Sequence, residues 1–195
     1  MIGGSGSLVV WGIAVVGGAL LVALIVSYNG LVRLRQLVKS AWADVDVYLK
    51  RRAELVPNVV ETVRAYAQHE KTVLEAVAEA RARATALVGP TAQHAQAETQ
   101  LGESLVRVVA LAEAYPELKA NKNFASLQTE LAESERLIAS ARQYFNACVR
   151  DYNTKIESFP SNLVASLGNV ESAEFFEVDL PSQRDAPDVT QVHSS

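Results

Sequence analysis

Residues 8–26 of this 195-residue chain read LVVWGIAVVGGALLVALIV, nineteen residues without a charged side chain. As an α-helix, this run would span about 28 Å, close to the ~30 Å thickness of the hydrocarbon core of a bilayer. The first charged side chain, Arg33, lies beyond the end of the run. We therefore predict a transmembrane helix over residues 8–27, preceded by a short outer N-terminus over residues 1–7.

Two other interpretations of the apolar run are less favoured. A cleavable signal peptide has basic residues ahead of a shorter apolar core and small residues at its cleavage site. Residues 1–7 contain no basic side chain, and the run leads into SYNG at residues 27–30 instead of an Ala-x-Ala site. A buried core helix of a soluble protein is usually shorter. The sequence favours a retained anchor.

Basic side chains follow the anchor. Residues 33–52 contain six basic and two acidic side chains, whereas residues 1–7 contain none of either kind. The positive-inside rule therefore predicts a cytoplasmic C-terminal body and an outer N-terminus. Arg33, Arg35 and Lys39 are the predicted membrane-surface contacts, since basic residues near the surface attract anionic headgroups. The alternative is an ordinary solvated helix face.

The chain after the anchor is predicted to be all-α. Apolar residues recur every three or four positions from Leu31 as far as Gly89-Pro90, where glycine and proline favour a helix end. Pro57 lies inside this stretch, and the sequence leaves open whether the helix is continuous or broken there. Further helices are predicted over residues 91–114, 123–158 and 161–167, the last with Ser161 as a candidate N-cap. Together they predict an antiparallel bundle of three to four long helices over residues 28–168.

The predicted helix over residues 123–158 has a regular seam with coiled-coil-like spacing. Its members are Phe124, Leu127, Leu131, Ser134, Ile138, Ala141, Phe145, Cys148 and Tyr152. Packing or oligomer contacts are predicted at Ala14, Gly18, Trp42, Phe145 and Tyr152, the first two because small residues four apart let membrane helices approach closely. Asn146 and Asn153 share a helix face and either fix helix register through buried hydrogen bonds or form an exposed polar edge.

The C-terminal region from residue 169 to residue 195 lacks periodicity and is acidic. Residues 161–195 contain six acidic side chains and one arginine. Such a composition predicts a largely disordered tail. Phe175 and Phe176 stand out in it as candidate docking residues for a protein partner, and duplex nucleic acid is not an expected partner.

The sequence contains no recognisable catalytic or metal-binding motif. The position three residues before each histidine is not glutamate, so the di-iron pattern of helical bundles is absent. The one cysteine, Cys148, lies on the seam, where a small buried residue is expected. Phosphate-binding and nucleophile motifs are also missing. We predict no catalytic residue, no metal and no cofactor, and a protein that is not an enzyme.

Several stretches resemble the LemA family. They include YNGLVRLR at 28–35, AWADVDV at 41–47, LKRR at 49–52, LVPNVVETV at 55–63, EAYPELKAN at 113–121, YFN at 144–146 and FP at 159–160. The resemblance covers most of the chain from residue 28 to about residue 177. It implies a bacterial protein of the inner membrane with one N-terminal anchor, a cytoplasmic helical bundle and no catalytic residues.

Two functions are compatible with these features. The leading hypothesis is a non-enzymatic scaffold that self-associates as a homo-oligomer on the lipid bilayer and organises or remodels it. The alternative is a membrane-tethered adaptor or signalling module that binds a protein partner through its bundle or acidic tail. An enzyme is the least favoured of the three classes, given the missing motifs.

Overall fold

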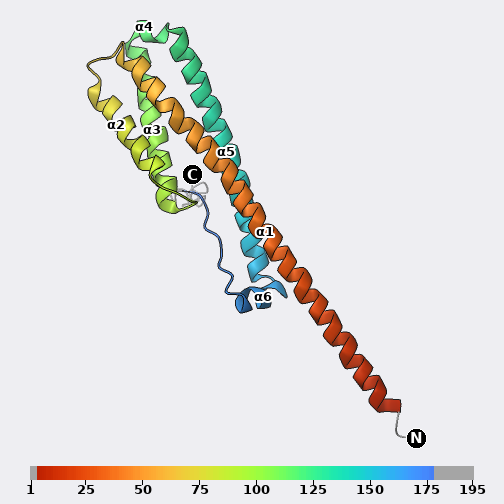
Figure 1. Cartoon of the computed structure of the whole chain (residues 1–195). Helices are drawn as coiled ribbons and strands as arrows, with labels where there is room; N and C mark the ends of the chain where they lie inside the picture. Colours follow the sequence, from red (N-terminus) through yellow and green to blue (C-terminus); the bar gives the residue numbers. More distant parts are fainter. Residues whose placement is uncertain (1–3, 178–195) are drawn as a thin grey trace, which may run out of the picture.

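The computed structural model describes residues 4–177, with side chains from residue 11 onward, and this part of the chain is all-α. The six helices are α1 (Gly4–Arg64), α2 (Lys71–Thr85), α3 (Ala92–Ala114), α4 (Pro116–Lys119), α5 (Lys122–Glu157) and α6 (Ser161–Leu167). Figure 1 shows α1 running the length of the molecule with α5 beside it, α2 and α3 along the upper half, and α6 at the lower end of α5. The predicted helical bundle is confirmed.

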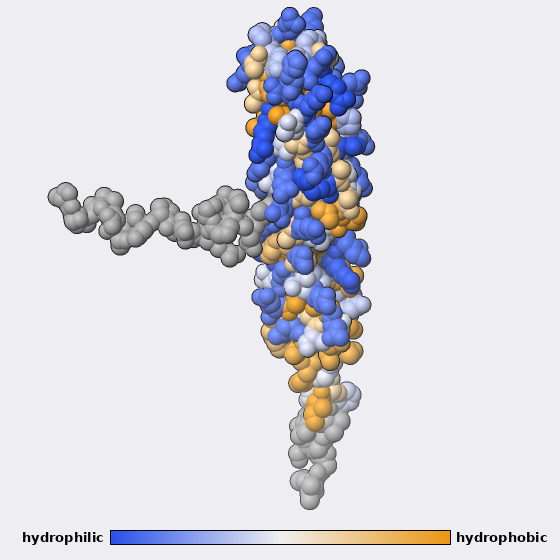
Figure 2. All heavy atoms as spheres, turned by 90° about the vertical axis from the view of Figure 1, so that its left-hand side faces the viewer, coloured by the Kyte–Doolittle hydropathy of each residue, from blue (hydrophilic) through white to orange (hydrophobic). Residues whose placement is uncertain are grey.

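The helix α1 joins the apolar run to the bundle without interruption. Its 61 residues correspond to about 91 Å. Within the described residues it is the one helix long and apolar enough to cross a membrane, and its most apolar stretch is almost entirely exposed. On the face drawn in Figure 2, hydrophobic side chains gather at the lower end of the bundle, where α1 leaves it.

The core is built from the predicted seams. The α5 seam is buried from Phe124 to Tyr152, with Ala141 half-buried. Facing it are buried residues of α1 at the same spacing, including Val45, Leu49 and Val56. These matching three-and-four patterns explain why α1 and α5 pack along each other, because each apolar stripe covers the other.

The first bundle helix does not extend to Gly89. It ends at Arg64, a turn over residues 65–70 follows, and α2 begins at Lys71. The turn is held by side chains at the distal end of the bundle: Asn121 Nδ2 donates to Tyr66 Oη at 2.8 Å, and Tyr115 Oη donates to Glu70 Oε1 at 3.2 Å. Burial and the hydrogen bond to Glu70 both raise the pKa of Tyr115 above its usual value. Tertiary contacts thus end a helix that the apolar pattern alone would continue.

The helix α1 is continuous through Pro57, and its neighbour α2 compensates for the missing amide. In an α-helix the carbonyl of Ala53 would accept from the N–H of residue 57, which proline lacks. Arg81 Nε, on α2, donates to the Ala53 carbonyl at 2.8 Å. An acceptor orphaned by the sequence of α1 is therefore satisfied by a side chain of α2.

Replacing Arg81 by methionine is expected to lower the free energy of unfolding by about 1–3 kcal/mol, because the Ala53 carbonyl loses its charged donor. In a Pro57→Ala background the cost should shrink, since a backbone N–H again reaches Ala53. Arg83→Met is the matched control, because Arg83 is half exposed and, among residues 4–177, pairs with Glu79 alone. Chemical denaturation of the full chain in mild detergent measures the stability of Arg81→Met, Pro57→Ala, their combination and Arg83→Met. Equal costs of Arg81→Met in both backgrounds would contradict this role.

The predicted N-cap of α6 is wrong. Ser161 is the first helical residue, fully buried, and its hydroxyl has no hydrogen-bond partner within the described structure. Pro160 occupies the cap position instead. The boundaries of α3, α5 and α6 agree with prediction to within one residue, whereas α1 begins at Gly4 instead of residue 8 and the short helix α4 was not predicted. Thr91 caps α3 by accepting from the His94 amide at 3.2 Å.

Candidate functional site

The base of the bundle begins where the apolar run ends. Ser27, one residue beyond the run, is 3% exposed, and Leu31 is also buried. Leu31 forms a small core with Tyr152 of α5 and Ala165 of α6. The bundle is therefore joined to the apolar helix without an intervening loop.

The three predicted membrane-surface residues lie exposed on α1 above this base. Arg33 and Arg35 are seven and nine residues beyond the apolar run, about 10–14 Å along the helix, and Lys39 is about 20 Å along it. Arg35 and Lys39 border a hollow of about 360 Å³ whose other wall is formed by residues 168–173. Screening over about 8–10 Å makes Lys39 the weakest of the three as a headgroup contact.

An aromatic cluster lies farther up the bundle. Trp42 packs edge-on against Phe145 and Phe176, with ring centroids 5.5 Å and 4.9 Å away, and against His94 at 5.9 Å. Phe145 is fully buried. The predicted packing residues Trp42, Phe145 and Tyr152 therefore make contacts within the chain.

The C-terminal segment, defined here as residues 169–177, is fastened to α5 by asparagine side chains. Asn153 Oδ1 accepts from the Ala173 amide at 2.9 Å, and its Nδ2 donates to the Ala173 carbonyl at 3.0 Å. Asn146 Oδ1 accepts from the Phe176 amide at 3.0 Å. Neither predicted role of the asparagines, helix register or exposed edge, is correct, because they bind an extended segment.

This placement corrects the interpretation of residues 169–177 as disordered. Phe176 is 0% exposed and Phe175 is half-buried, so neither is a free docking side chain in this arrangement. The Arg142 guanidinium lies 5.3 Å from the centroid of the Phe176 ring, and burial lowers the pKa of Arg142 below its usual value. Residues 178–195 of the predicted tail lie outside the described residues.

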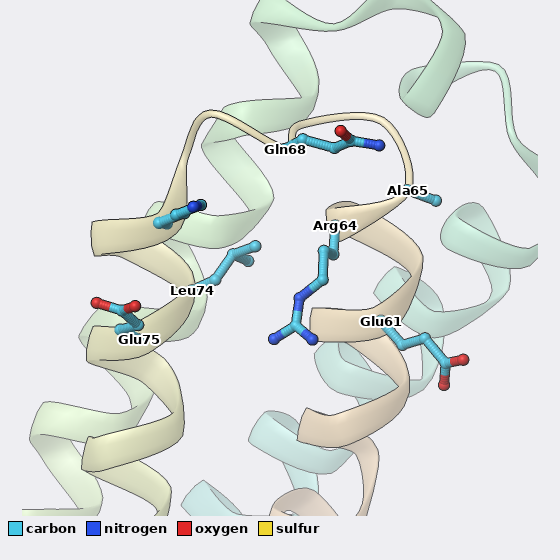
Figure 3. A pocket seen from close by; sticks show the side chains of 7 residues that line it. Glu61, Arg64, Ala65, Gln68, Leu74 and Glu75 are labelled. Carbon is cyan, nitrogen blue, oxygen red and sulfur yellow. The ribbon is translucent and has the colours of Figure 1, made fainter.

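The distal end of the bundle has an open cavity of about 640 Å³ between α1 and α2. Figure 3 shows Arg64 and Leu74 reaching from facing helices toward the space between them, while Glu75 points away from it. Charges of both signs border the cavity without converging on one point. The cavity therefore has no arrangement that favours one charged ligand.

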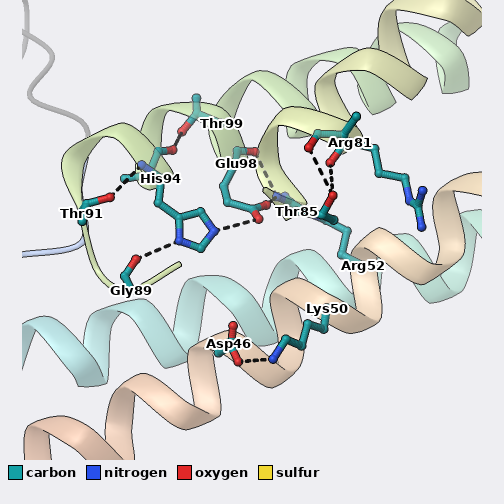
Figure 4. Close-up of polar contacts among 12 residues, drawn as sticks. Asp46, Lys50, Arg52, Arg81, Thr85, Gly89, Thr91, His94, Glu98 and Thr99 are labelled. Carbon is teal, nitrogen blue, oxygen red and sulfur yellow. Dashed lines mark hydrogen bonds and ion pairs between the residues drawn. The ribbon is translucent and has the colours of Figure 1, made fainter. Parts of the chain in front are cut away.

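A buried ionic network lies between α1, α3 and α5. Arg52, with 4% of its side chain exposed, pairs with the buried carboxylate of Glu98, donates to the Glu98 carbonyl at 2.9 Å and reaches Glu135 Oε1 at 2.7 Å. His94 Nε2 lies 3.4 Å from Glu98 Oε1, and His94 Nδ1 bonds the carbonyl of Gly89 at 2.8 Å (Figure 4). Gly89 has a φ of +85°, a conformation that favours glycine.

This network was not predicted, although the sequence contains a signal for it. Arg52 continues the α1 stripe Val45, Leu49, Val56 at steps of three and four, and Glu98 continues the α3 stripe His94, Leu101, Leu105. Charged residues at seam positions are rarely buried without a partner. Two opposite charges on two seams therefore indicate a buried pair.

The chemistry available to these groups is limited. Within residues 4–177, no group of three or more His, Cys, Asp or Glu side chains is arranged to hold a metal ion. The Glu98 carboxylate is bound by Arg52, and Cys148 is buried among seam residues. Both groups are used for packing and pairing.

The small residues of the apolar run are open for contact. Ala14 is exposed, and a Cβ added at Gly18 would have no neighbouring atom within 4 Å. This surface of α1 is free to pack against lipid or another helix.

Comparisons with known proteins find similarity to the LemA family and to magnetosome proteins. The model of the LemA family matches residues 41–190. Magnetosome protein MamQ 2 of Paramagnetospirillum magneticum is 23% identical over 82% of this chain and 68% of its own length. Magnetosome protein MamQ of Magnetospirillum gryphiswaldense is 22% identical over 81% and 67%, and protein LemA of Metamycoplasma hominis is 23% identical over 70% and 63%.

Proposed function

Because the chain belongs to the LemA family, we propose that it is a non-enzymatic scaffold, anchored by residues 8–27, whose bundles self-associate at the bacterial inner membrane and organise the bilayer. The family, the MamQ relatives and the apolar part of α1 indicate a membrane-associated helical protein. The chemistry of the described site supports a structural role, since Glu98 and Cys148 are engaged in packing and pairing.

The observation that carries the proposal is the continuity of α1 from Gly4 to Arg64. A flexible linker would let the bundle tumble independently of its anchor. A helix that enters the core at Ser27 instead ties the direction of the bundle to the direction of the anchor. Contacts between neighbouring copies, through their bundles and through the open surface at Ala14 and Gly18, would then set the spacing and tilt of the anchors in the membrane.

The proposed orientation places the bundle in the cytoplasm. It is supported by the six basic side chains in residues 33–52. Cysteine introduced at Ser5 in a Cys148→Ala background should react with a membrane-impermeant maleimide in intact cells. A cysteine at Val106 should react only after the cells are opened. The reverse pattern would refute the orientation.

Self-association is tested by the mass of the full chain in mild detergent across a concentration series. The wild type is expected to form assemblies, and Gly18→Ile should raise the concentration at half-assembly by about tenfold, equivalent to about 1.4 kcal/mol. Gly12→Ile is the matched control: it lies about 120° around the helix from Gly18 and is equally open. A wild type that stays monomeric at high concentration would refute the scaffold.

A further inference from the structure

The base of the bundle carries an exposed apolar surface outside the anchor. Phe159 is 79% exposed, Leu163 50% and Leu167 86%, and the last two lie four residues apart on α6. No charged residue occurs from Phe159 to Val170, although 21% of the whole chain is charged. We call Phe159, Leu163 and Leu167 the basal apolar surface.

The buried face of α6 determines where the basal apolar surface lies along the axis of α1. Ser161 and Ala165 are buried, and Ala165 packs with Leu31 of α1. Leu31 is five residues beyond the apolar run, about 8 Å along the helix. The headgroup region extends a similar distance beyond the hydrocarbon core. Figure 1 shows α6 beside α1 at the lower end of the bundle. The basal apolar surface is thus carried to the height at which α1 would pass through the membrane interface.

The surroundings are those of a membrane interface. Tyr28 is 58% exposed on α1, and amphipathic aromatic residues of this kind concentrate at headgroup level. Arg33 is exposed five residues farther along α1, and Lys155 lies close to Gly30. A surface of apolar side chains flanked by an aromatic residue and basic residues favours contact with anionic lipid over contact with an acidic protein.

We propose that α6 is an interfacial helix, with Phe159, Leu163 and Leu167 inserted between the lipid headgroups beside the anchor. This inference rests on the proposed membrane anchoring and is independent of self-association. The protein then contacts the bilayer at two points, α1 and α6, instead of one. Two points fix the rotation of the bundle about the anchor axis, which a single helix leaves free.

The test uses the full chain in nanodiscs of anionic lipid that hold one copy each. In a Cys148→Ala background, single cysteines at Leu163 and Leu167 are labelled with an environment-sensitive dye, and lipids carrying a quencher are added to the discs. Val106→Cys is the control. Val106 is 68% exposed on α3, and Glu98 of the same helix pairs with Arg52, about 38 Å along α1 from Ser27.

Dyes at positions 163 and 167 are expected to show blue-shifted emission and at least fivefold stronger lipid quenching than the dye at 106. Equal quenching at all three positions would overturn the proposal. A blue shift at 163 and 167 without lipid quenching would also overturn it, because protein would then cover the surface. Protein that fails to co-elute with the discs would refute anchoring itself, a result distinct from co-elution without quenching.

A second readout avoids labels on α6. Leu163→Gln combined with Leu167→Gln leaves the buried face of α6 intact, because Ser161 and Ala165 are unchanged. Hydrogen exchange of residues 159–167 in discs should be at least tenfold faster in this variant than in the wild type, while exchange in α3 stays the same. Unchanged exchange in α6 would count against the proposal.

Discussion

Replacing Arg52 by methionine is expected to lower the free energy of unfolding by about 3–5 kcal/mol, among the largest losses for any single substitution in this protein. The variant leaves the Glu98 carboxylate, 7% exposed, without its cationic partner. Removing a charge from water without a partner costs several kcal/mol. Most of the expected loss therefore comes from the unpaired Glu98, and less from Glu135, which is 46% exposed.

Arg51→Met is the matched control, because Arg51 is the adjacent exposed residue on α1 and should change stability by no more than about 0.5 kcal/mol. The double variant Arg52→Met, Glu98→Leu should recover most of the loss, since an apolar pair often replaces a buried ion pair at little cost. Urea denaturation of the full chain in detergent, followed by circular dichroism, compares the three variants. Arg52→Met and Arg51→Met with equal stabilities would show that the network is not important for folding.

The fold was largely predictable because it depends on repeated patterns. The α5 seam from Phe124 to Tyr152 is set by the three-and-four spacing of apolar residues, and the structure buries it as expected. The end of α1 at Arg64 was not predictable in this way. Residues 65–70 contain neither glycine nor proline, and the turn depends on Tyr66 and Glu70 binding residues about fifty positions away.

The site was less predictable because it is made of single contacts. Arg81 could not be assigned to the Ala53 carbonyl until α2 was placed beside α1. Asn146 and Asn153 lie one heptad apart, which predicted a shared face correctly but not the extended segment that they bind. Aperiodic residues such as Phe176 give no repeating signal, so their burial follows only from the assembled bundle.

Phe176→Ala is expected to release the C-terminal segment from the bundle. Truncating a fully buried phenylalanine costs about 3–5 kcal/mol in a core. In this segment the destabilisation cannot exceed the free energy with which the segment docks, because the segment detaches while the bundle stays folded. The amides of Ala173 and Phe176, which donate to Asn153 and Asn146, should therefore exchange about a hundredfold faster or more.

Hydrogen exchange with mass spectrometry separates this local release from global unfolding, since α5 should keep its protection. Phe175→Ala is the control, because Phe175 is only half-buried and should have a much smaller effect. Loss of protection in α5 together with the segment would contradict a separately detachable unit. Any partner that binds Phe176 must first displace it from Trp42 and His94. The docking free energy measured by this exchange is thus the free energy that a partner's binding must supply under the adaptor hypothesis. Phe176 itself can contact a partner only when the segment is detached.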